Sequence, residues 1–279
     1  MYGNHWSRED AETVELIKSI PTAMRRMGWT VSAQLMERWL QTPAWVLPTD
    51  WKKRKTSPNL MPSFTQIDQN TVRMSWARSY QRLRSMMDEL RTAMANEPAR
   101  KELRTKTAKI QLSPDWSIFG SQTYSAFRLD GLHQSNAREF GGFSDPLDDM
   151  YGSLGMATLK VALIGEAKRD PRSQRVTIRA THAGYYIRDT YDFNGFQFLG
   201  TWTKTGVLHS IQPPLPLTSH GVISHLGKEP VSHVFNHDFE SYRRVTGLGG
   251  DFIVYSDVVW EPVDMTLELD PPTDRDMEP

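Results

Sequence analysis

The spacing of apolar residues changes near residue 108, and this change limits which folds the chain can adopt. From Val72 to Met94 an apolar side chain recurs every three or four residues, which predicts one long amphipathic helix. After residue 108, short segments such as 175–181 alternate apolar and polar residues, which is typical of half-buried antiparallel strands. The sequence therefore predicts an α+β fold, with a helical N-terminal region followed by an antiparallel sheet domain.

Local signals place further elements along the chain. Ser7 is suited to cap a helix that Pro21 is expected to end, and a second helix is expected to begin at Thr30 or Ser32. Short helices are expected at residues 124–129 and 238–245. Strands are expected at residues 157–164, 175–181, 185–192, 196–203 and 252–259.

The charges divide the chain at nearly the same place as the apolar spacing. Residues 1–109 contain 19 Lys and Arg against 11 Asp and Glu, whereas residues 110–279 contain 14 against 22. Such asymmetry favours a docking surface, although attraction between the two halves explains it equally well. We expect a helical region for secretion or partner docking at 1–108, an α+β catalytic domain at 109–265 and an acidic tail at 266–279.

The composition excludes several classes of protein. The chain contains no cysteine, which excludes disulfides, zinc fingers, iron–sulfur clusters and thiol nucleophiles. Hydrophobic residues make up 38% of the sequence, enough for a packed core, and no segment approaches the roughly 20 apolar residues of a membrane-spanning helix. The first ten residues lack the features of a secretory signal, so we expect synthesis in the cytoplasm without a signal peptide.

The densest polar cluster ends an expected strand, just before Asn194-Gly195, a pair that predicts a tight hairpin turn. Alternation along the strand places Asp189 and Tyr191 on one face, and the strand end lets Asp192 approach the same pocket. Two carboxylates and a phenol can hold a divalent metal through oxygen ligands and activate water against a phosphoester. Alternatively, these residues only form the turn at a strand end.

The segment D-x-Y-D-F that begins at Asp189 resembles the core motif of the colicin M family of bacterial toxins. The match covers Asp189, Tyr191 and Asp192, while Phe198 and Leu199 stand where that family has a His-Arg pair. The resemblance implies a partly barrel-like catalytic domain that cleaves lipid II, the undecaprenyl-linked peptidoglycan precursor, in the periplasm of a competitor cell. It also implies a divalent metal, Mg²⁺, bound by Asp189 and Asp192.

A longer pattern extends over residues 160–262. It comprises Y-D-F-N-G-F-Q-F-L-G-x-W from Tyr191, F-N-x-D-F-x-x-Y-R-R from Phe235 and G-x-G-G-D-F-x-V-Y-S-D from Gly247. This pattern is similar to an uncharacterised bacterial family that is often encoded beside type VI secretion spike genes. The resemblance implies delivery by secretion, action in the target-cell periplasm, and spike components and a cognate immunity protein as partners.

Cationic residues further along the chain are candidates to replace the missing His-Arg pair. His237 and Arg243 are six residues apart, so that one helix would let them flank one site, and Arg244 is the next residue. Histidines four residues apart can ligate a metal, but ordinary surface or core histidines explain the pattern as well. Five histidines lie close together in sequence: His209, His220, His225, His233 and His237.

Three functions are compatible with these patterns. The first is an antibacterial type VI secretion effector that hydrolyses a phosphoester, with lipid II as the leading substrate; Asp189 and Asp192 bind the metal or activate water, and Tyr191 orients the substrate. Its basic N-terminal region would meet the lipid-linked substrate at a membrane surface. The second is a non-enzymatic secretion adaptor or cargo-binding protein. The third and least favoured is a nuclease toxin whose basic residues 51–109 contact nucleic acid.

Overall fold

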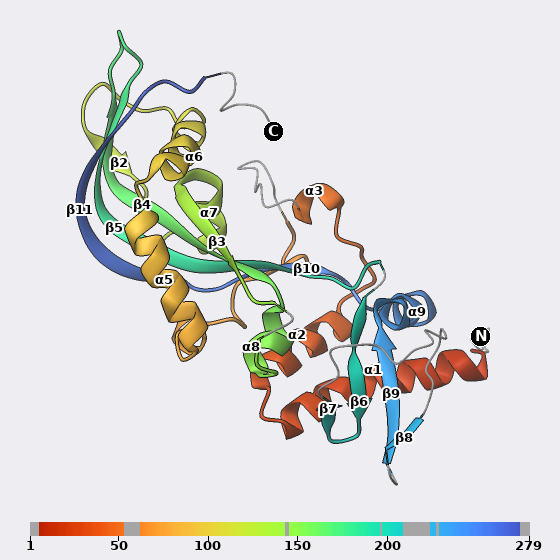
Figure 1. Cartoon of the computed structure of the whole chain (residues 1–279). Coiled ribbons are helices and arrows are strands. Elements are labelled where there is room, and N and C mark those ends of the chain that lie inside the picture. The colour runs from red at the N-terminus through yellow and green to blue at the C-terminus, as the bar shows by residue number, and fades with distance from the viewer. Residues whose placement is uncertain are drawn as a thin grey trace.

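The computed structural model describes residues 6–52, 62–142, 145–195, 197–208, 224–226 and 229–273. These residues form an α+β fold with a helical N-terminal region, as predicted (Figure 1). The helices are α1 (Arg8–Arg26), α2 (Thr30–Gln41), α3 (Thr49–Lys52), α4 (Met74–Ala77), α5 (Gln81–Ala93), α6 (Glu97–Thr107), α7 (Ala126–Leu132), α8 (Asp149–Leu154) and α9 (Asn236–Thr246). The strands are β1 (Ile67–Asp68), β2 (Ser117–Phe119), β3 (Gln134–Phe140), β4 (Ala157–Arg169), β5 (Val176–Tyr191), β6 (Phe198–Thr203), β7 (Gly206–Leu208), β8 (Ser224–Leu226), β9 (Glu229–Phe235), β10 (Phe252–Tyr255) and β11 (Val259–Leu269).

Strand β5 organises the larger sheet. One edge of β5 pairs with β4 from Val176 to Arg188, and its other edge pairs first with β11 and then with β10. The strand order is β1-β10-β5-β4-β2, with β11 also on β5 and β3 also on β4. Figure 1 shows that this sheet is strongly curved, but it stays open and is not a closed barrel.

A smaller antiparallel sheet forms the other end of the molecule. Its strand order is β7-β6-β9-β8, and it lies beside α1 and α9 (Figure 1). The chain enters this sheet directly from the end of β5, and the last strand of this sheet leads into α9. The end of β5 therefore lies at the junction between the two sheets.

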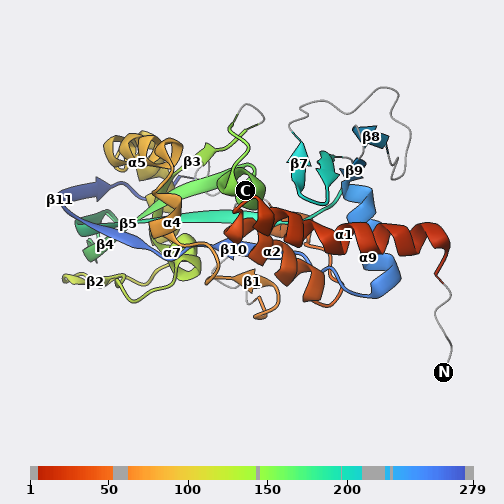
Figure 2. The ribbon, with the colours of Figure 1, turned by 90° about the horizontal axis from the view of Figure 1, so that it is seen from below.

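Alternation along the strands separates two hydrophobic clusters on opposite faces of the larger sheet. Leu159 and Val161 of β4 belong to the cluster that contains helix α5, whereas Ala162 and Ile164 belong to the cluster that contains α7. Figure 2 shows these two helices on opposite sides of the sheet. The first cluster also contains the buried residues of α1 and α2, so the helical region and the sheet share a core. A domain boundary at residue 108 stays a prediction.

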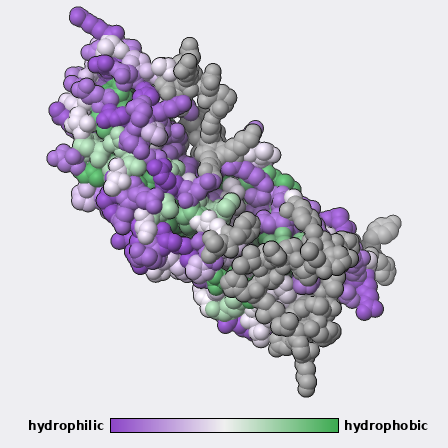
Figure 3. Space-filling model, in the orientation of Figure 1, coloured by the Kyte–Doolittle hydropathy of each residue, from purple (hydrophilic) through white to green (hydrophobic). Residues whose placement is uncertain are grey.

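The surface over the larger sheet is mostly hydrophilic on the face shown in Figure 3. Within the described part of the chain, no helix combines the length and the apolar character that crossing a bilayer requires.

Two predictions for the helical region were wrong. Pro21 does not end α1, which continues to Arg26. Pro21 is buried, and the packing of α1 against α2 and α9 offsets the one backbone hydrogen bond that the proline removes. The expected single helix over residues 72–94 is broken between α4 and α5. At the break, the Ser79 hydroxyl donates a hydrogen bond to the Trp76 carbonyl (2.6 Å), which competes with continuation of the helix.

The strand predictions also need correction. The segments 175–181 and 185–192 form one strand, because Gly184 is not a turn residue but leaves room for the ring of Trp260, which a Cβ would approach to 2.6 Å. The expected strand 252–259 is interrupted where Ser256 exchanges hydrogen bonds with Ile187. Residues up to Leu269 continue β11, so the described part of the expected acidic tail begins as a strand.

The expected hairpin at Asn194-Gly195 does not form. Gly195 has a positive φ of 80°, as expected for a turn, but β5 and β6 belong to different sheets, and β6 pairs with β7 and β9. The Asn194 side chain instead hydrogen-bonds to two carboxylates, and this leads the chain away from β5. Residues 274–279, and the histidines at 209 and 220, lie outside the described residues.

A buried carboxylate joins five elements on the α7 side of the larger sheet. Asp130 of α7 is fully buried and accepts hydrogen bonds from Lys160 of β4 (2.5 Å), Tyr186 of β5 (3.1 Å) and Tyr255 of β10 (2.6 Å). Lys106 of α6 donates to the Asp130 carbonyl (2.7 Å). Burial alone would raise the pKa of Asp130, but the neighbouring cations outweigh it and lower this pKa to about 2.

We predict that Asp130→Ala strongly destabilises the fold. The change leaves the ammonium of Lys160 buried without its carboxylate, which typically costs about 3–5 kcal/mol. Urea unfolding at neutral pH measures this loss, with Asp115→Ala as the control because Asp115 is exposed. A loss as small as that of the control would show that Asp130 does not hold these elements together.

Candidate functional site

The end of β5 is paired along one edge only, and this opens the candidate site. Strand β4 begins at Ala157, and its Thr158 pairs with Arg188 of β5. Beyond Arg188, β5 pairs only with β10, where Asp189 lies opposite Val254 and Tyr191 opposite Phe252. Residues 189–191 therefore have no neighbouring strand on the edge that β4 leaves free.

Alternation along β5 separates Asp189 and Tyr191 from Arg188. Arg188 points to the α7 side, where its Nε lies 3.8 Å from Asp130. Tyr191 belongs to the cluster on the opposite face and stacks on Phe252, with ring centroids 5.2 Å apart. This placement confirms the prediction that Asp189 and Tyr191 share a face of the strand.

A large cavity lies where β5 ends, with a volume of about 720 Å³. This volume falls in the range of sites for small molecules and cofactors, roughly 300–1,000 Å³. Its walls are mostly apolar and come from α1, α2, α8, the smaller sheet and α9. The lining residues used below are Trp29, Asp145, Tyr151, Asp189, Tyr191, Asp192, Asn194, Phe198, Leu199, Trp202 and Asn236.

Asp189 is a carboxyl group without a countercharge at the cavity wall. It is partly exposed, and none of the ion pairs formed among the described residues involves it. Burial raises the pKa of Asp189 well above its usual value of 3.8, and the nearby Asp192 raises it further, whereas the Thr190 N–H and Arg188 lower it less. Asp189 therefore keeps its proton to a higher pH than an ordinary aspartate, which is typical of functional sites.

Asp192 forms an ion pair at the same end of the cavity. Its carboxylate forms an ion pair with Lys52 and accepts a hydrogen bond from the Asn194 side-chain amide (3.1 Å). The Asp192 side chain is 14% exposed and the Lys52 side chain 31%. The structure thus places Asp189, Tyr191 and Asp192 around one cavity, where Asp192 is paired with a cation and Asp189 has no countercharge among the described residues.

Arg243 lies behind this end of the cavity and does not line it. Its guanidinium forms an ion pair with the buried Asp251 and donates hydrogen bonds to the Gly249 carbonyl (2.6 Å) and to Asn194 Oδ1 (3.3 Å). Asp251 also accepts from the Trp39 indole (3.0 Å) and from Asn194 (2.9 Å). Arg243 is therefore connected to Asp192 only through Asn194 and helps to hold the turn after β5.

The other predicted cations lie away from the cavity. Arg244 is 64% exposed and binds Asp10 of α1 (2.8 Å). His237 lies 3.3 Å from Asp238 and stacks on Phe235, and His233 shares a hydrogen bond with Thr201. Neither histidine lines the cavity, and the side chain of His225 lies outside the described residues.

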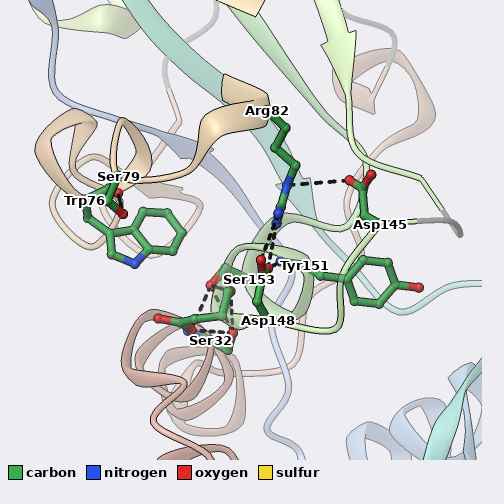
Figure 4. Close-up of polar contacts among 9 residues, drawn as sticks. Ser32, Trp76, Ser79, Arg82, Asp145, Asp148, Tyr151 and Ser153 are labelled. Atoms are coloured by element: carbon green, nitrogen blue, oxygen red, sulfur yellow. Dashed lines mark hydrogen bonds and ion pairs between the residues drawn. The ribbon is translucent and has the colours of Figure 1, made fainter. Parts of the chain in front are cut away.

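Two other polar groups of the cavity wall were not predicted from the sequence. Figure 4 shows Arg82 of α5 bound to Asp148 by two hydrogen bonds (2.6 and 2.8 Å) and to Asp145 (3.5 Å). Asp145 and Tyr151 line the cavity, and burial together with Asp145 raises the pKa of Tyr151. The only sequence signal was the acidic pair Asp148-Asp149 ahead of a short helix, where Asp148 accepts from the Tyr151 N–H as a helix cap.

A side chain of α8 caps the N-terminus of α2 and so joins the two helices. Trp29, the residue before α2, provides no side-chain cap, and the Asp149 carboxylate accepts hydrogen bonds from the Val31 and Ser32 N–H groups (3.0 and 2.8 Å) instead. The Ser32 hydroxyl also donates to Asp149 (2.7 Å) and lies 3.0 Å from the Ser153 hydroxyl (Figure 4). This cap holds two walls of the cavity together.

Asn236 presents an unpaired acceptor at the cavity. Its side-chain amide donates to the Asn194 carbonyl (3.0 Å), but its Oδ1 is buried and has no hydrogen-bond partner among the described residues. Buried acceptors are nearly always satisfied, so Asn236 Oδ1 is an exception at the cavity wall.

The predicted metal site consists of two carboxyl groups. Among the described residues, no group of three His, Cys, Asp or Glu side chains is arranged to hold a metal ion. Mg²⁺ is nevertheless often held by one or two carboxylates together with water and substrate phosphates. Asp189 and Asp192 match that pattern if Asp189 gives up its proton and Asp192 exchanges Lys52 for the metal, and Mg²⁺ stays a prediction.

Comparison with known proteins places the chain in a family. A family model matches residues 16–270, a range that contains every residue of the cavity wall. The chain belongs to DUF6402, a family of unknown function. No curated protein and no solved structure gives a significant match to this DUF6402 chain.

We predict that Asp189→Asn stabilises the fold at neutral pH. Because the pKa of Asp189 is raised in the folded state, the unfolded chain releases this proton first, and stability falls as pH rises above 3.8. Asparagine removes this pH-dependent penalty. Urea unfolding at pH 5 and pH 8 measures the effect, and the gain should be larger at pH 8.

The exposed Asp115→Asn serves as the matched control and should change stability little at either pH. A loss of stability in Asp189→Asn that is the same at both pH values would contradict the assignment of a raised pKa.

Proposed function

We propose that the cavity is the active site of a hydrolase that cleaves a phosphoester bond in a lipid-linked substrate, with lipid II as the leading candidate. The observation that carries this proposal is that Asp189, Tyr191 and Asp192, the matched residues of the colicin M-like motif, line one large cavity. Phe198 and Leu199, which stand in place of that family's His-Arg pair, line it as well.

The apolar and polar groups of the cavity wall suit the two parts of an amphipathic substrate. Trp29, Phe198, Leu199 and Trp202 offer apolar surface to a lipid chain, and burial of that chain is favourable by roughly 25 cal/mol per Å². The carboxyl groups, by contrast, gather where β5 ends and would face the phosphate group. Sites of this kind combine apolar walls with a few polar groups that set orientation.

The different surroundings of the two carboxyl groups suit acid–base hydrolysis. In the proposed reaction Asp192 takes a proton from a water molecule as the water oxygen bonds to phosphorus. The bond from phosphorus to the leaving oxygen breaks, and Asp189 gives its proton to that oxygen. Pairs of acids in different environments commonly share these roles. Tyr191 packs beside Asp189 and would orient the substrate.

A divalent metal is a second proposed feature of the site. Bound by Asp189 and Asp192, Mg²⁺ would neutralise phosphate charge. A metal that uses Asp189 as a ligand must displace the proton of Asp189, so metal binding would strengthen as pH rises. The pH dependence of metal binding therefore separates a ligand role of Asp189 from a proton-donor role.

Delivery and partners belong to the same proposal. The longer pattern over residues 160–262 supports a type VI secretion effector, with spike components and a cognate immunity protein as partners and the target-cell periplasm as the place of action. Lipid II presents its head group on the periplasmic side only after export, whereas a nuclease would act in the cytoplasm. A non-enzymatic adaptor would need neither carboxyl group.

We predict that the purified protein releases the head group of lipid II in the presence of Mg²⁺. Asp189→Asn and Asp192→Asn should each lower kcat by about 100-fold or more, as expected when a positioned acid or base is lost. Chromatography of the water-soluble product measures turnover, and Asp115→Asn should match the wild type. Background turnover by every form would remove the lipid II hypothesis.

A further inference from the structure

The proposed reaction brings an anionic phosphate to a cavity whose polar end is acidic. Asp189 and Asp192 line this end, and none of the described lining residues is a lysine, arginine or histidine. Phe198 and Leu199, which stand where the colicin M family has a His-Arg pair, make this wall apolar. Without a cation nearby, the Asp192 carboxylate and a phosphate would repel each other.

The two arginines that the sequence offered as cations for the site, Arg243 and Arg244, form ion pairs with other residues. Arg243 is 10% exposed and bound to Asp251, Gly249 and Asn194, so moving it would leave the buried Asp251 without its counterion. Arg244 binds Asp10 on the outside of α1. Neither arginine contacts Asp189 or Asp192 in the described structure.

Lys52 is the cationic side chain that contacts this acidic end in the described part of the chain. Its ammonium pairs with Asp192 Oδ1, the same oxygen that accepts from Asn194. At 31% exposure, the Lys52 side chain retains access to solvent, whereas Asp192 is more deeply placed. A lysine carries a compact charge on a flexible four-carbon stem, so the ammonium can shift by a few ångströms while its backbone stays in place.

A hydrogen bond and a ring contact hold the backbone beside Lys52 in place. The Trp51 carbonyl accepts a hydrogen bond from Arg188 (2.5 Å). The Arg188 side chain is 4% exposed and points to the α7 side of β5. The Trp51 ring packs edge-on against Trp45, with centroids 5.4 Å apart. Helix α3 therefore keeps Lys52 next to Asp192 even though α3 is only one turn long.

We propose that Lys52 is the phosphate-binding residue of this site. The inference rests on the proposed function. When substrate enters, the Lys52 ammonium moves from Asp192 to a phosphate oxygen, and Asp192 becomes available to take a proton from water. Lys52 thus supplies, from the N-terminal helical region, the positive charge that Phe198 and Leu199 do not provide.

Calorimetric titration with sodium pyrophosphate tests this assignment without requiring turnover. Lys52→Met should weaken pyrophosphate binding at least tenfold, because a single charge-assisted contact is lost. Lys52→Arg should retain most of the affinity, since it keeps the charge. Lys101→Met, at an exposed lysine of α6, should bind as the wild type does. Circular dichroism of each variant verifies that the fold is intact.

The outcomes separate this inference from the proposed hydrolysis. Equal pyrophosphate affinity in Lys52→Met and the wild type, or no binding by the wild type, would overturn the role of Lys52 even if lipid II is cleaved. Lys52-dependent binding without cleavage of lipid II would instead support the phosphate site and contradict the proposed reaction. If Lys52-dependent binding of pyrophosphate and cleavage of lipid II are both observed, Lys52→Met should raise the KM for lipid II.

Discussion

The buried Asp130 carboxylate constrains the strand from which the candidate site is built. It joins α7 to β4, β5 and β10 by hydrogen bonds from Lys160, Tyr186 and Tyr255, on the face of the larger sheet opposite the cavity. The register that these bonds fix places Arg188 beside Asp130 and turns Asp189 to the other face. Removing one partner of a buried ion pair is strongly destabilising. The geometry of the site therefore depends on the contacts of Asp130 on the opposite face of the sheet.

The candidate site lowers the stability of the folded protein. Asp189 lies where β5 has lost one neighbouring strand, in a wall that raises its pKa and offers it no countercharge among the described residues. Asp192, three residues later, is held by Lys52 and Asn194. A partly buried carboxyl group such as Asp189, without a countercharge among the described residues, costs folding free energy, and binding or catalysis is the usual reason that proteins retain one. The apolar walls around both acids make the cavity amphipathic.

Several features could be predicted from sequence because they depend on local rules. Alternation placed Asp189 and Tyr191 on one face correctly, and helical spacing identified most of α5. Pro21 was misinterpreted and the single strand β5 was predicted as two strands, since only tertiary packing shows that α1 tolerates its proline and that Gly184 accommodates Trp260. Lys52, Asp145 and Tyr151 were missed because contacts between distant segments, such as Lys52 with Asp192, leave no periodic signal in the sequence.

The most direct test of this account is a ¹³C NMR titration of the Asp189 carboxyl carbon in the folded protein. The account predicts a midpoint well above the usual 3.8, because the wall of the cavity removes water from the carboxylate without supplying a cation. The signal should also shift when a substrate fragment such as pyrophosphate occupies the cavity. A midpoint at or below 3.8, with no response to the ligand, would contradict the claim that the end of β5 forms the functional site.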